Sequence, residues 1–227
     1  MKFQDVLLSV VPFMVFCIPY YFMESIDRTP SALGSRVQVE KRQKDRLDQD
    51  SSDISEQIKT EMLTQGIPIE LVQSTGIITL KMDDYFRNND SNLSVSSKMK
   101  LKKFFPAYVK GLFHDPYLLK KIRNISITGF SSPRYRQKYL NPFENNPEAF
   151  SYNLGLSIAR AQKMIEFALG VEIGEYPFKK EFRPLVVVSG QGHLSPIPLD
   201  PTLPSDEPCP PFDCARSRRI EIKFVLN

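Results

Sequence analysis

Three polar residues, Asn153, Ser157 and Arg160, recur at positions i, i+4 and i+7 of one stretch of the chain. Residues with this spacing share one face of an α-helix, so they would form a polar stripe with a guanidinium at its end. The planar donors of arginine suit a carboxylate bidentately, which makes the stripe a candidate site for an anionic ligand. A solvent-facing helix can carry the same residues without a ligand, so the stripe alone leaves both interpretations open.

The helix that carries the stripe is predicted from Asn153 to Leu169 by its apolar periodicity. Five apolar residues recur on a second face, which we expect to pack in the core: Leu154, Ile158, Ala161, Ile165 and Ala168. The preceding segment, Ser131 to Phe150, is polar and contains Pro133, Pro142 and Pro147. Loops of this length are uncommon unless they bind a ligand or are mobile, so we expect this one to form a wall of the ligand groove.

The rest of the pattern predicts strands and one further helix. Alternating residues and helical spacing give four strands and a helix: strands Gly76–Met82, Ile122–Phe130, Phe182–Val188 and Arg219–Leu226, and helix Ser96–Phe113. No helix follows Gly190-Gln-Gly192, so this segment indicates a tight turn rather than a phosphate-binding loop. The order β-α-β-α-β-β predicts an α+β fold, a two-layer sandwich with helices on one face of a mixed sheet.

Cys209 and Cys214 lie in a proline-rich segment with four residues between them. This spacing favours a local disulfide if the compartment is oxidising. A metal site is the alternative, but it would need more ligands, and His114 and His193 are isolated in sequence. Cys17 lies in an apolar run and behaves there as a small hydrophobic residue. We therefore expect a disulfide and no metal or other cofactor.

The 227 residues, 41% of them hydrophobic, suffice for one sizeable domain with appendages. A net charge of +4 is too small to indicate nucleic-acid binding, and no nucleic-acid motif accompanies the basic runs. Ser189 and His193 lie close in sequence, but nothing indicates an oriented base or an oxyanion hole. We expect neither an enzyme nor a nucleic-acid-binding protein.

Residues 1–23 predict a membrane anchor headed by an acidic residue. The run from Val6 to Met23 is nearly all apolar, at the short end of the roughly 17 to 25 residues that span a bilayer as a helix. No small-residue cleavage site follows it, so we expect an uncleaved anchor with its amino end inside. Asp5 at the margin is either an N-terminal helix cap or a proton carrier, because ionisable groups in membrane segments commonly mark proton pathways.

Residues 24–69 predict a linker with a short helix. Pro30 and Gly34 indicate an irregular exit from the anchor, and Asp53 with Glu56 resembles a capping box. Four apolar residues around the predicted helix are spaced by seven, four and four: Leu47, Ile54, Ile58 and Met62. Such a stripe permits pairing with a second copy, and docking onto the chain's own domain explains it equally well.

The pattern Asn-x-x-Leu-Ser-x-x-Arg-Ala at 153–161 resembles the signature helix of the OmpA-like (OmpA/MotB C-terminal) peptidoglycan-binding domain. Three further segments resemble its neighbouring strands and turn: Ile125–Ser132, Gly190–Pro196 and Arg218–Ile222. The resemblance implies such a domain at 70–227, in which Ser131, Ser132, Asn153, Ser157 and Arg160 contact the peptidoglycan stem peptide. In that family an aspartate and the arginine grip the two ends of diaminopimelate, and Ser132 stands here at the aspartate position.

The segment Phe3–Leu8 resembles the start of the single membrane helix of MotB-like and ExbD-like stator subunits, whose aspartate carries protons. The two resemblances together imply the B subunit of a proton-driven motor in the bacterial inner membrane, with a cytoplasmic amino end and a periplasmic domain. Its partners would be a second copy of the chain and a ring of polytopic A-type (MotA-, ZorA- or ExbB-like) subunits. The Ser-Ser turn also occurs in B subunits of Zorya anti-phage systems. The alternative is a membrane-anchored wall tether without ion transport, in which Asp5 is a cap.

Overall fold

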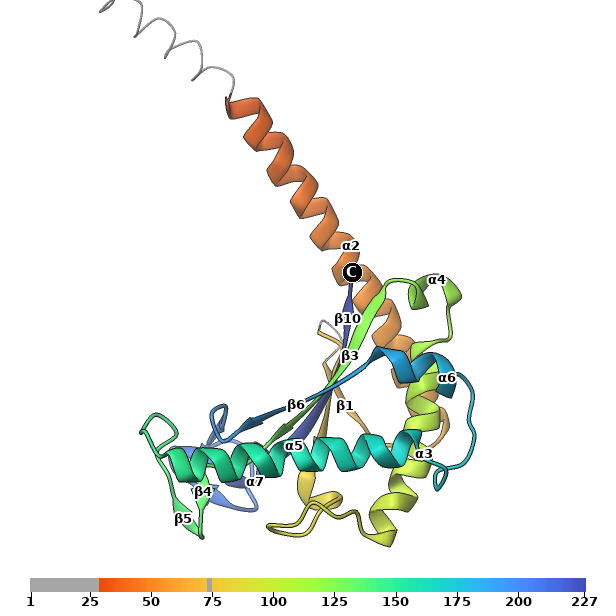
Figure 1. Ribbon diagram of the computed structural model, residues 1–227. Helices are drawn as coiled ribbons and strands as arrows, with labels where there is room; N and C mark the ends of the chain where they lie inside the picture. The colour runs from red at the N-terminus through yellow and green to blue at the C-terminus, as the bar shows by residue number, and fades with distance from the viewer. Residues whose placement is uncertain (1–28, 73–74) are drawn as a thin grey trace, which may run out of the picture. The chain divides into compact units, whose positions relative to one another are not determined.

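The computed structural model describes residues 29–72 and 75–227 (Figure 1). The predicted anchor at 1–23, and Asp5 with it, lies outside the described residues. Within the described ranges, no helix is both long and apolar enough to cross a membrane. The chain divides into two compact units, Met1–Leu47 and Asp48–Asn227, and each is described by itself.

Helix α2 spans Thr29–Thr64, so the helix of the linker is longer than the short one expected. It includes Pro30 and Gly34, which were predicted to be irregular; a proline is accommodated in the first turn, where a backbone N–H has no intrahelical partner. In the first unit, the described side chains of residues 36–46 are all exposed.

In the second unit, helix α2 contributes to the domain core. Ile54, Ile58 and Met62 are fully buried there. The contact with the next helix is close, since a Cβ added at Gly111 would lie 2.7 Å from Ile58 Cα. These three side chains pack into the chain's own domain and are therefore not a seam for pairing with a second copy.

The domain is built on a five-stranded mixed sheet in the order β1-β2-β10-β3-β6. Its strands are β1 (Glu70–Val72), β2 (Ile77–Lys81), β3 (Ile122–Phe130), β6 (Val186–Gly192) and β10 (Arg219–Leu226). Strands β3 and β6 are parallel, and the other neighbours are antiparallel. Along β3 and β10 buried residues alternate with less buried ones, as expected when one face of a sheet is covered. The α+β class with a mixed sheet is confirmed.

Helix α5 (Pro147–Leu169) packs against strands β3 and β6, and helix α3 (Val95–Leu112) packs against α5 (Figure 1). Helix α3 brings aromatic rings into the core, where Phe104 stacks on Tyr108 at 5.9 Å and Phe182 meets Tyr108 edge-on. Helix α5 crosses the region of β3 and β6. Its first turn is capped by Asn146, whose side chain accepts from Ala149 N at 3.1 Å, so the helix begins six residues before the predicted Asn153.

Short elements surround the sheet. They are η1 (Met82–Asp84), α4 (Pro116–Leu119), the hairpin β4 (Arg134–Tyr135) and β5 (Lys138–Tyr139), α6 (Lys179–Phe182), η2 (Arg183–Leu185), and a small sheet β7 (Ile197–Pro198), β9 (Phe212–Asp213) and β8 (Pro208–Cys209), followed by α7 (Cys214–Ser217). The predicted loop Ser131–Phe150 thus contains the β4–β5 hairpin and the start of α5.

Strand β6 differs from its prediction at both ends. It begins at Val186, because Phe182 belongs to α6 and its ring is fully buried in the core. It continues through Gly190 and Gly192, which were predicted to form a turn. The glycines belong to the strand because a helix lies against it: a Cβ at Gly190 would come within 2.9 Å of Ile158 N.

Candidate functional site

The polar stripe of α5 faces the protein interior. Asn153, Ser157 and Arg160 are 3%, 0% and 3% exposed, whereas Ile158, predicted to be in the core, is 38% exposed. Leu154 is only partly buried. The stripe and the core residues Ala161, Met164 and Ala168 together form the buried side of the helix. The polar side chains therefore find partners inside the domain.

Ser157 joins α5 to the sheet. Its hydroxyl donates to Leu154 O at 2.8 Å and accepts from Gly192 N at 3.1 Å. A Cβ at Gly129 would lie 2.1 Å from Ser157 O, so the helix backbone rests directly on a strand glycine. Ser157 was expected to contact the ligand, but it does not line the cavity described below and instead fixes the helix against β3 and β6.

Asn153 and Ser131 hold the β4–β5 hairpin against α5. Asn153 Nδ2 donates to Arg134 O at 3.0 Å and lies 3.2 Å from His193 Nδ1. Because Nδ2 is a donor, Nδ1 must accept, which requires a neutral imidazole; burial also lowers the pKa of His193. The Ser131 hydroxyl donates to Asn153 O at 3.0 Å, and its N–H donates to Gly192 O at 2.7 Å.

Arg160 clamps the loop that follows η1. Its Nε donates to Asp90 O at 2.8 Å, its Nη2 donates to Arg87 O at 3.0 Å, and its Nη1 lies 2.7 Å from Met82 Sδ. Burial lowers the pKa of Arg160 to about 10, so the guanidinium is still charged at neutral pH. The other two of its five N–H groups, one on each Nη, make no hydrogen bond to the described residues. The family resemblance implied that Arg160 contacts the ligand; in the structure, two of its nitrogens donate to the carbonyls of Arg87 and Asp90 and so order the 87–90 loop.

A small cavity of about 70 Å³ lies beside this helix, the hairpin and the loop. Four of the five predicted binding residues line it, namely Ser131, Ser132, Asn153 and Arg160. Its charged lining residues are four arginines and one glutamate: Arg134, Arg136, Arg160, Arg218 and Glu207. Arginines outnumber carboxylates in the lining, although Arg136 and Arg218 also pair with carboxylates outside it, and the remaining positive charge favours an anionic occupant.

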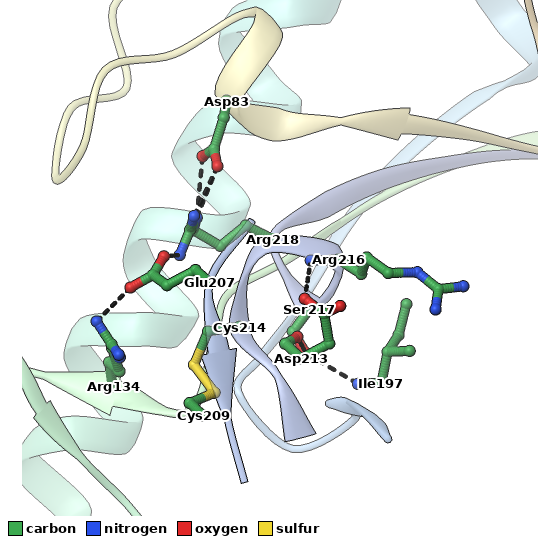
Figure 2. The surroundings of a disulfide bond; sticks show 10 residues. All are labelled: Asp83, Arg134, Ile197, Glu207, Cys209, Asp213, Cys214, Arg216, Ser217 and Arg218. Atoms are coloured by element: carbon green, nitrogen blue, oxygen red, sulfur yellow. Dashed lines mark hydrogen bonds and ion pairs between the residues drawn. A yellow bond between two sulfur atoms is a disulfide. The ribbon is translucent and has the colours of Figure 1, made fainter. Parts of the chain in front are cut away.

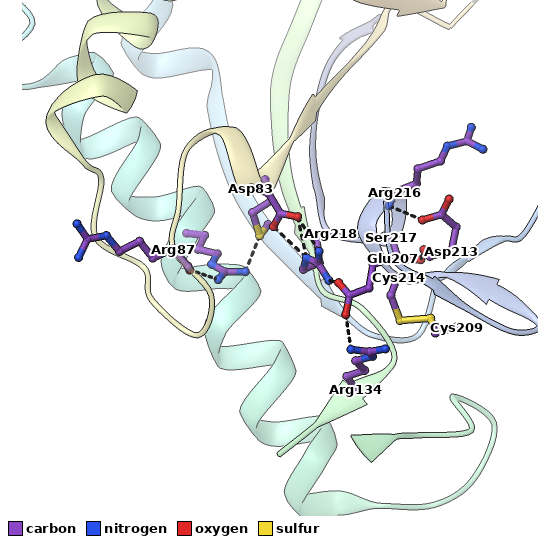
Figure 3. Close-up of polar contacts among 12 residues, drawn as sticks. Asp83, Arg87, Arg134, Glu207, Cys209, Asp213, Cys214, Arg216, Ser217 and Arg218 are labelled. Carbon is purple, nitrogen blue, oxygen red and sulfur yellow. Dashed lines mark hydrogen bonds and ion pairs between the residues drawn. A yellow bond between two sulfur atoms is a disulfide. The ribbon is translucent and has the colours of Figure 1, made fainter. Parts of the chain in front are cut away.

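Glu207 links two of these arginines. Its Oε1 accepts from Arg134 Nη1 and its Oε2 accepts from Arg218 Nη1 (Figure 3). Arg218 is also held by Asp83, with Nε 2.9 Å from Oδ1 and Nη2 2.6 Å from Oδ2. Arg134 has no such second support, and its buried Nε has no hydrogen-bond partner within the described residues. The cavity wall thus carries an unsatisfied cationic donor.

The loop that directly follows Glu207 is closed by a disulfide between Cys209 and Cys214 (Figure 2). Cys214 N donates to Glu207 O at 3.0 Å across the same small loop. Asp213 caps α7 through Arg216 N at 2.9 Å. A rigid loop therefore delivers the glutamate to the cavity.

No sequence pattern marked Arg134, Glu207 or Arg218 as site residues. Arg134 and Glu207 are 73 positions apart, and Asp83 and Arg218 are 135 apart. The hairpin and the small sheet bring Arg134 to Glu207, and η1 places Asp83 beside Arg218. The spacing of the two cysteines could have marked Glu207 as belonging to an ordered loop.

The fold is similar to solved structures of bacterial proteins. A MotB-like protein from Desulfovibrio vulgaris has a TM-score of 0.51 and 15% identity, over 81% of this chain and 96% of that chain. The periplasmic domain of Helicobacter pylori MotB has a TM-score of 0.43 and 17% identity, over 70% of this chain and 81% of that chain. The cell wall anchor of the T6SS from Pseudomonas aeruginosa has a TM-score of 0.44 and 18% identity, over 78% of this chain and 99% of that chain. No protein-family model and no curated protein sequence matches the chain. The likeness to the MotB-like protein establishes the fold.

Proposed function

From the OmpA/MotB C-terminal fold that this chain shares with a MotB-like protein, we propose that its domain tethers the chain to the cell wall. The domain would hold an anionic group of the peptidoglycan stem peptide in the arginine-walled cavity. The observation that supports this most directly is the buried Arg134 Nε, which has no hydrogen-bond partner within the described residues. An unsatisfied buried donor is costly, and a ligand oxygen would remove that cost.

The charge and the size of the cavity favour a carboxylate. Arg136 and Arg218 are each paired with a carboxylate outside the lining, so the attraction for an entering anion comes mainly from Arg160 and from Arg134. A volume of about 70 Å³ has room for a few water molecules or one small anionic group, but not for a sugar ring. Stem peptides carry carboxylates, and guanidinium groups bind them with good geometry. Ser132 adds a hydroxyl but no charge to the wall, so the site would recognise the anionic group of the ligand through its arginines.

A pull-down of the full chain on isolated sacculi tests the tether. Arg134→Gln removes the charge and the unsatisfied donor, so we expect binding to weaken by about tenfold or more, as for loss of a charge-assisted hydrogen bond. Arg160→Ala should also weaken binding, because the 87–90 loop loses its clamp. Arg183→Gln is the matched control, since Arg183 is exposed and does not line the cavity. Equal retention of the Arg134 variant and the wild type would exclude this site.

For the whole chain, the proposal is a stator B subunit in the bacterial inner membrane. Asp5 at the head of the apolar run would carry protons, and two copies would pass through a ring of polytopic A-type subunits. Each proton delivers about 2.3 kcal/mol per 100 mV of membrane potential, enough to drive a conformational step. The wall tether would let that step produce torque. Phage defence of the Zorya kind is one use of such a motor.

The second candidate is a membrane-anchored wall tether without ion transport. It is favoured by the fact that the arginine-walled cavity needs only the residues from Asp48 onward and no proton carrier. Isolation of the chain from membranes separates the two candidates. Co-purification of a multi-spanning partner supports the motor, whereas a chain that purifies without one supports the tether.

A further inference from the structure

Glu207 occupies the position in the cavity that suits an anion. It is the one acidic residue among those lining the cavity, and both of its carboxylate oxygens accept from arginines of the wall. Figure 2 shows Arg134 and Arg218 reaching this carboxylate from two sides. A ligand carboxylate in the same place would use the same donors.

We propose that Glu207 is an internal competitor that sets the affinity of this site for anionic ligands. This rests on the proposed function of the cavity. A wall carboxylate binds by displacing the Glu207 carboxylate from Arg134 and then takes the released Nη1 donor. Glu207 divides its two oxygens between Arg134 and Arg218, so it does not form the two parallel bonds to one guanidinium that a ligand carboxylate can form.

The exchange takes place at Arg134 because the two arginines are supported differently. Arg218 keeps its position without Glu207, since Asp83 holds it through both Nε and Nη2. The side chain of Arg134 has Glu207 as its ion-pair partner, and the two side chains are 36% and 31% exposed. A pair this accessible to water is weak, so an incoming carboxylate can replace it.

The disulfide keeps the competitor close to the arginines. The bond between Cys209 and Cys214 and the hydrogen bond from Cys214 N to Glu207 O fix the backbone of Glu207 beside the cavity. Its side chain can rotate away from Arg134, but its backbone cannot leave. The effective concentration of the internal carboxylate therefore stays high, which lowers the apparent affinity for any free anion.

The experiment is binding of the full chain to isolated sacculi, measured over a range of sacculus concentrations. We expect Glu207→Gln to bind about two- to fivefold more tightly than the wild type, the range expected for loss of a solvent-accessible ion pair. Glu175→Gln is the matched control, because it removes the same charge at a place away from the cavity. Glu175 is 85% exposed and pairs with Lys179 at 3.6 Å. This variant should bind like the wild type. Thermal melts check that both variants fold.

A second variant, Cys209→Ser with Cys214→Ser, releases the loop while keeping Glu207. It should also tighten binding, by less than Glu207→Gln does. If the wild type binds and Glu207→Gln binds equally or less tightly, the competitor role is overturned while the cavity remains the proposed wall site. If neither protein binds sacculi, both the competitor role and the proposed function are overturned. Weaker binding by the double serine variant would overturn the role of the disulfide as a tether for Glu207.

Discussion

Asn153 and His193 form a buried contact that depends on a neutral imidazole. The 3.2 Å contact pairs an amide donor with Nδ1, and protonation of the ring would replace the acceptor with a second donor. Burial acts in the same direction, since it lowers the pKa of His193. The charge state of one side chain therefore affects how α5 holds the carbonyl of Arg134, which borders the cavity.

This contact predicts a pH dependence of stability. The folded pKa of His193 lies below the unfolded value of about 6.5, so the unfolded chain binds more protons at mildly acidic pH. The contribution of His193 is complete above about pH 6.5 and is lost as the pH falls toward the folded pKa. We expect the free energy of unfolding to drop between pH 7.5 and 5.5, and to drop less in His193→Asn. Chemical denaturation at the two pH values measures this.

His114→Asn is the control for this measurement, because His114 is exposed and no described contact depends on it. It should retain the pH dependence of the wild type. Identical slopes for His193→Asn and the wild type would show that the Asn153 contact survives protonation.

Helix α5 approaches the sheet through glycines. Where it crosses β3 and β6, Gly129 and Gly190 leave space for the backbone and hydroxyl of Ser157. This close approach explains why the polar stripe faces inward. Apolar periodicity placed Ile158 in the core, but at this crossing the sheet offers a glycine surface and hydrogen-bonding partners rather than a large apolar pocket.

Gly129→Ala should therefore destabilise the domain by about 1–3 kcal/mol, the usual cost of overpacking, because the new Cβ would lie 2.1 Å from Ser157 O. Gly155 lies on α5 itself, and nothing is within 4 Å of a Cβ added there, so Gly155→Ala should stabilise the domain by about 0.5–1 kcal/mol. Urea unfolding of the two variants measures both effects. A neutral Gly129→Ala would mean that α5 can shift away from β3 at little cost.

The elements were predicted well where the pattern is local. Strands Ile122–Phe130 and Arg219–Leu226 coincide with their predictions, because alternation of buried and exposed residues is visible along each strand. The strand predicted from Phe182 was misplaced, since that aromatic residue belongs to a short helix that packs in the core. An apolar residue beside a strand pattern cannot be assigned without its tertiary contacts.

The proposed motor places two activities on one chain: proton transport at Asp5 and wall binding by the domain. Asp5→Asn should abolish proton flux into vesicles that contain the chain with its polytopic partner, because a neutral amide cannot exchange a proton. The same variant should still assemble with that partner and bind sacculi. A pH-sensitive dye inside the vesicles measures the flux.

Arg134→Gln is the complementary control for that experiment. It should lose sacculus binding and keep proton flux, because the described cavity belongs to the unit that begins at Asp48. Full flux in Asp5→Asn would refute the proton role of that residue and favour the wall tether without transport.

The mixed α+β fold, the helix with its signature and most of the strands could be predicted from sequence patterns. Each of these is visible as a short period or a local motif, and four of the five predicted binding residues do line one cavity. Three features became visible only in the folded chain: the burial of the α5 stripe, the clamping of a loop by Arg160, and an ion-pair network that joins Arg134, Glu207 and Arg218. The reason is that hydrophobic periodicity records only which local face of an element is apolar. The two ion pairs join residues that are separated in sequence by 73 and by 135 positions, so they form only after strands and loops have come together.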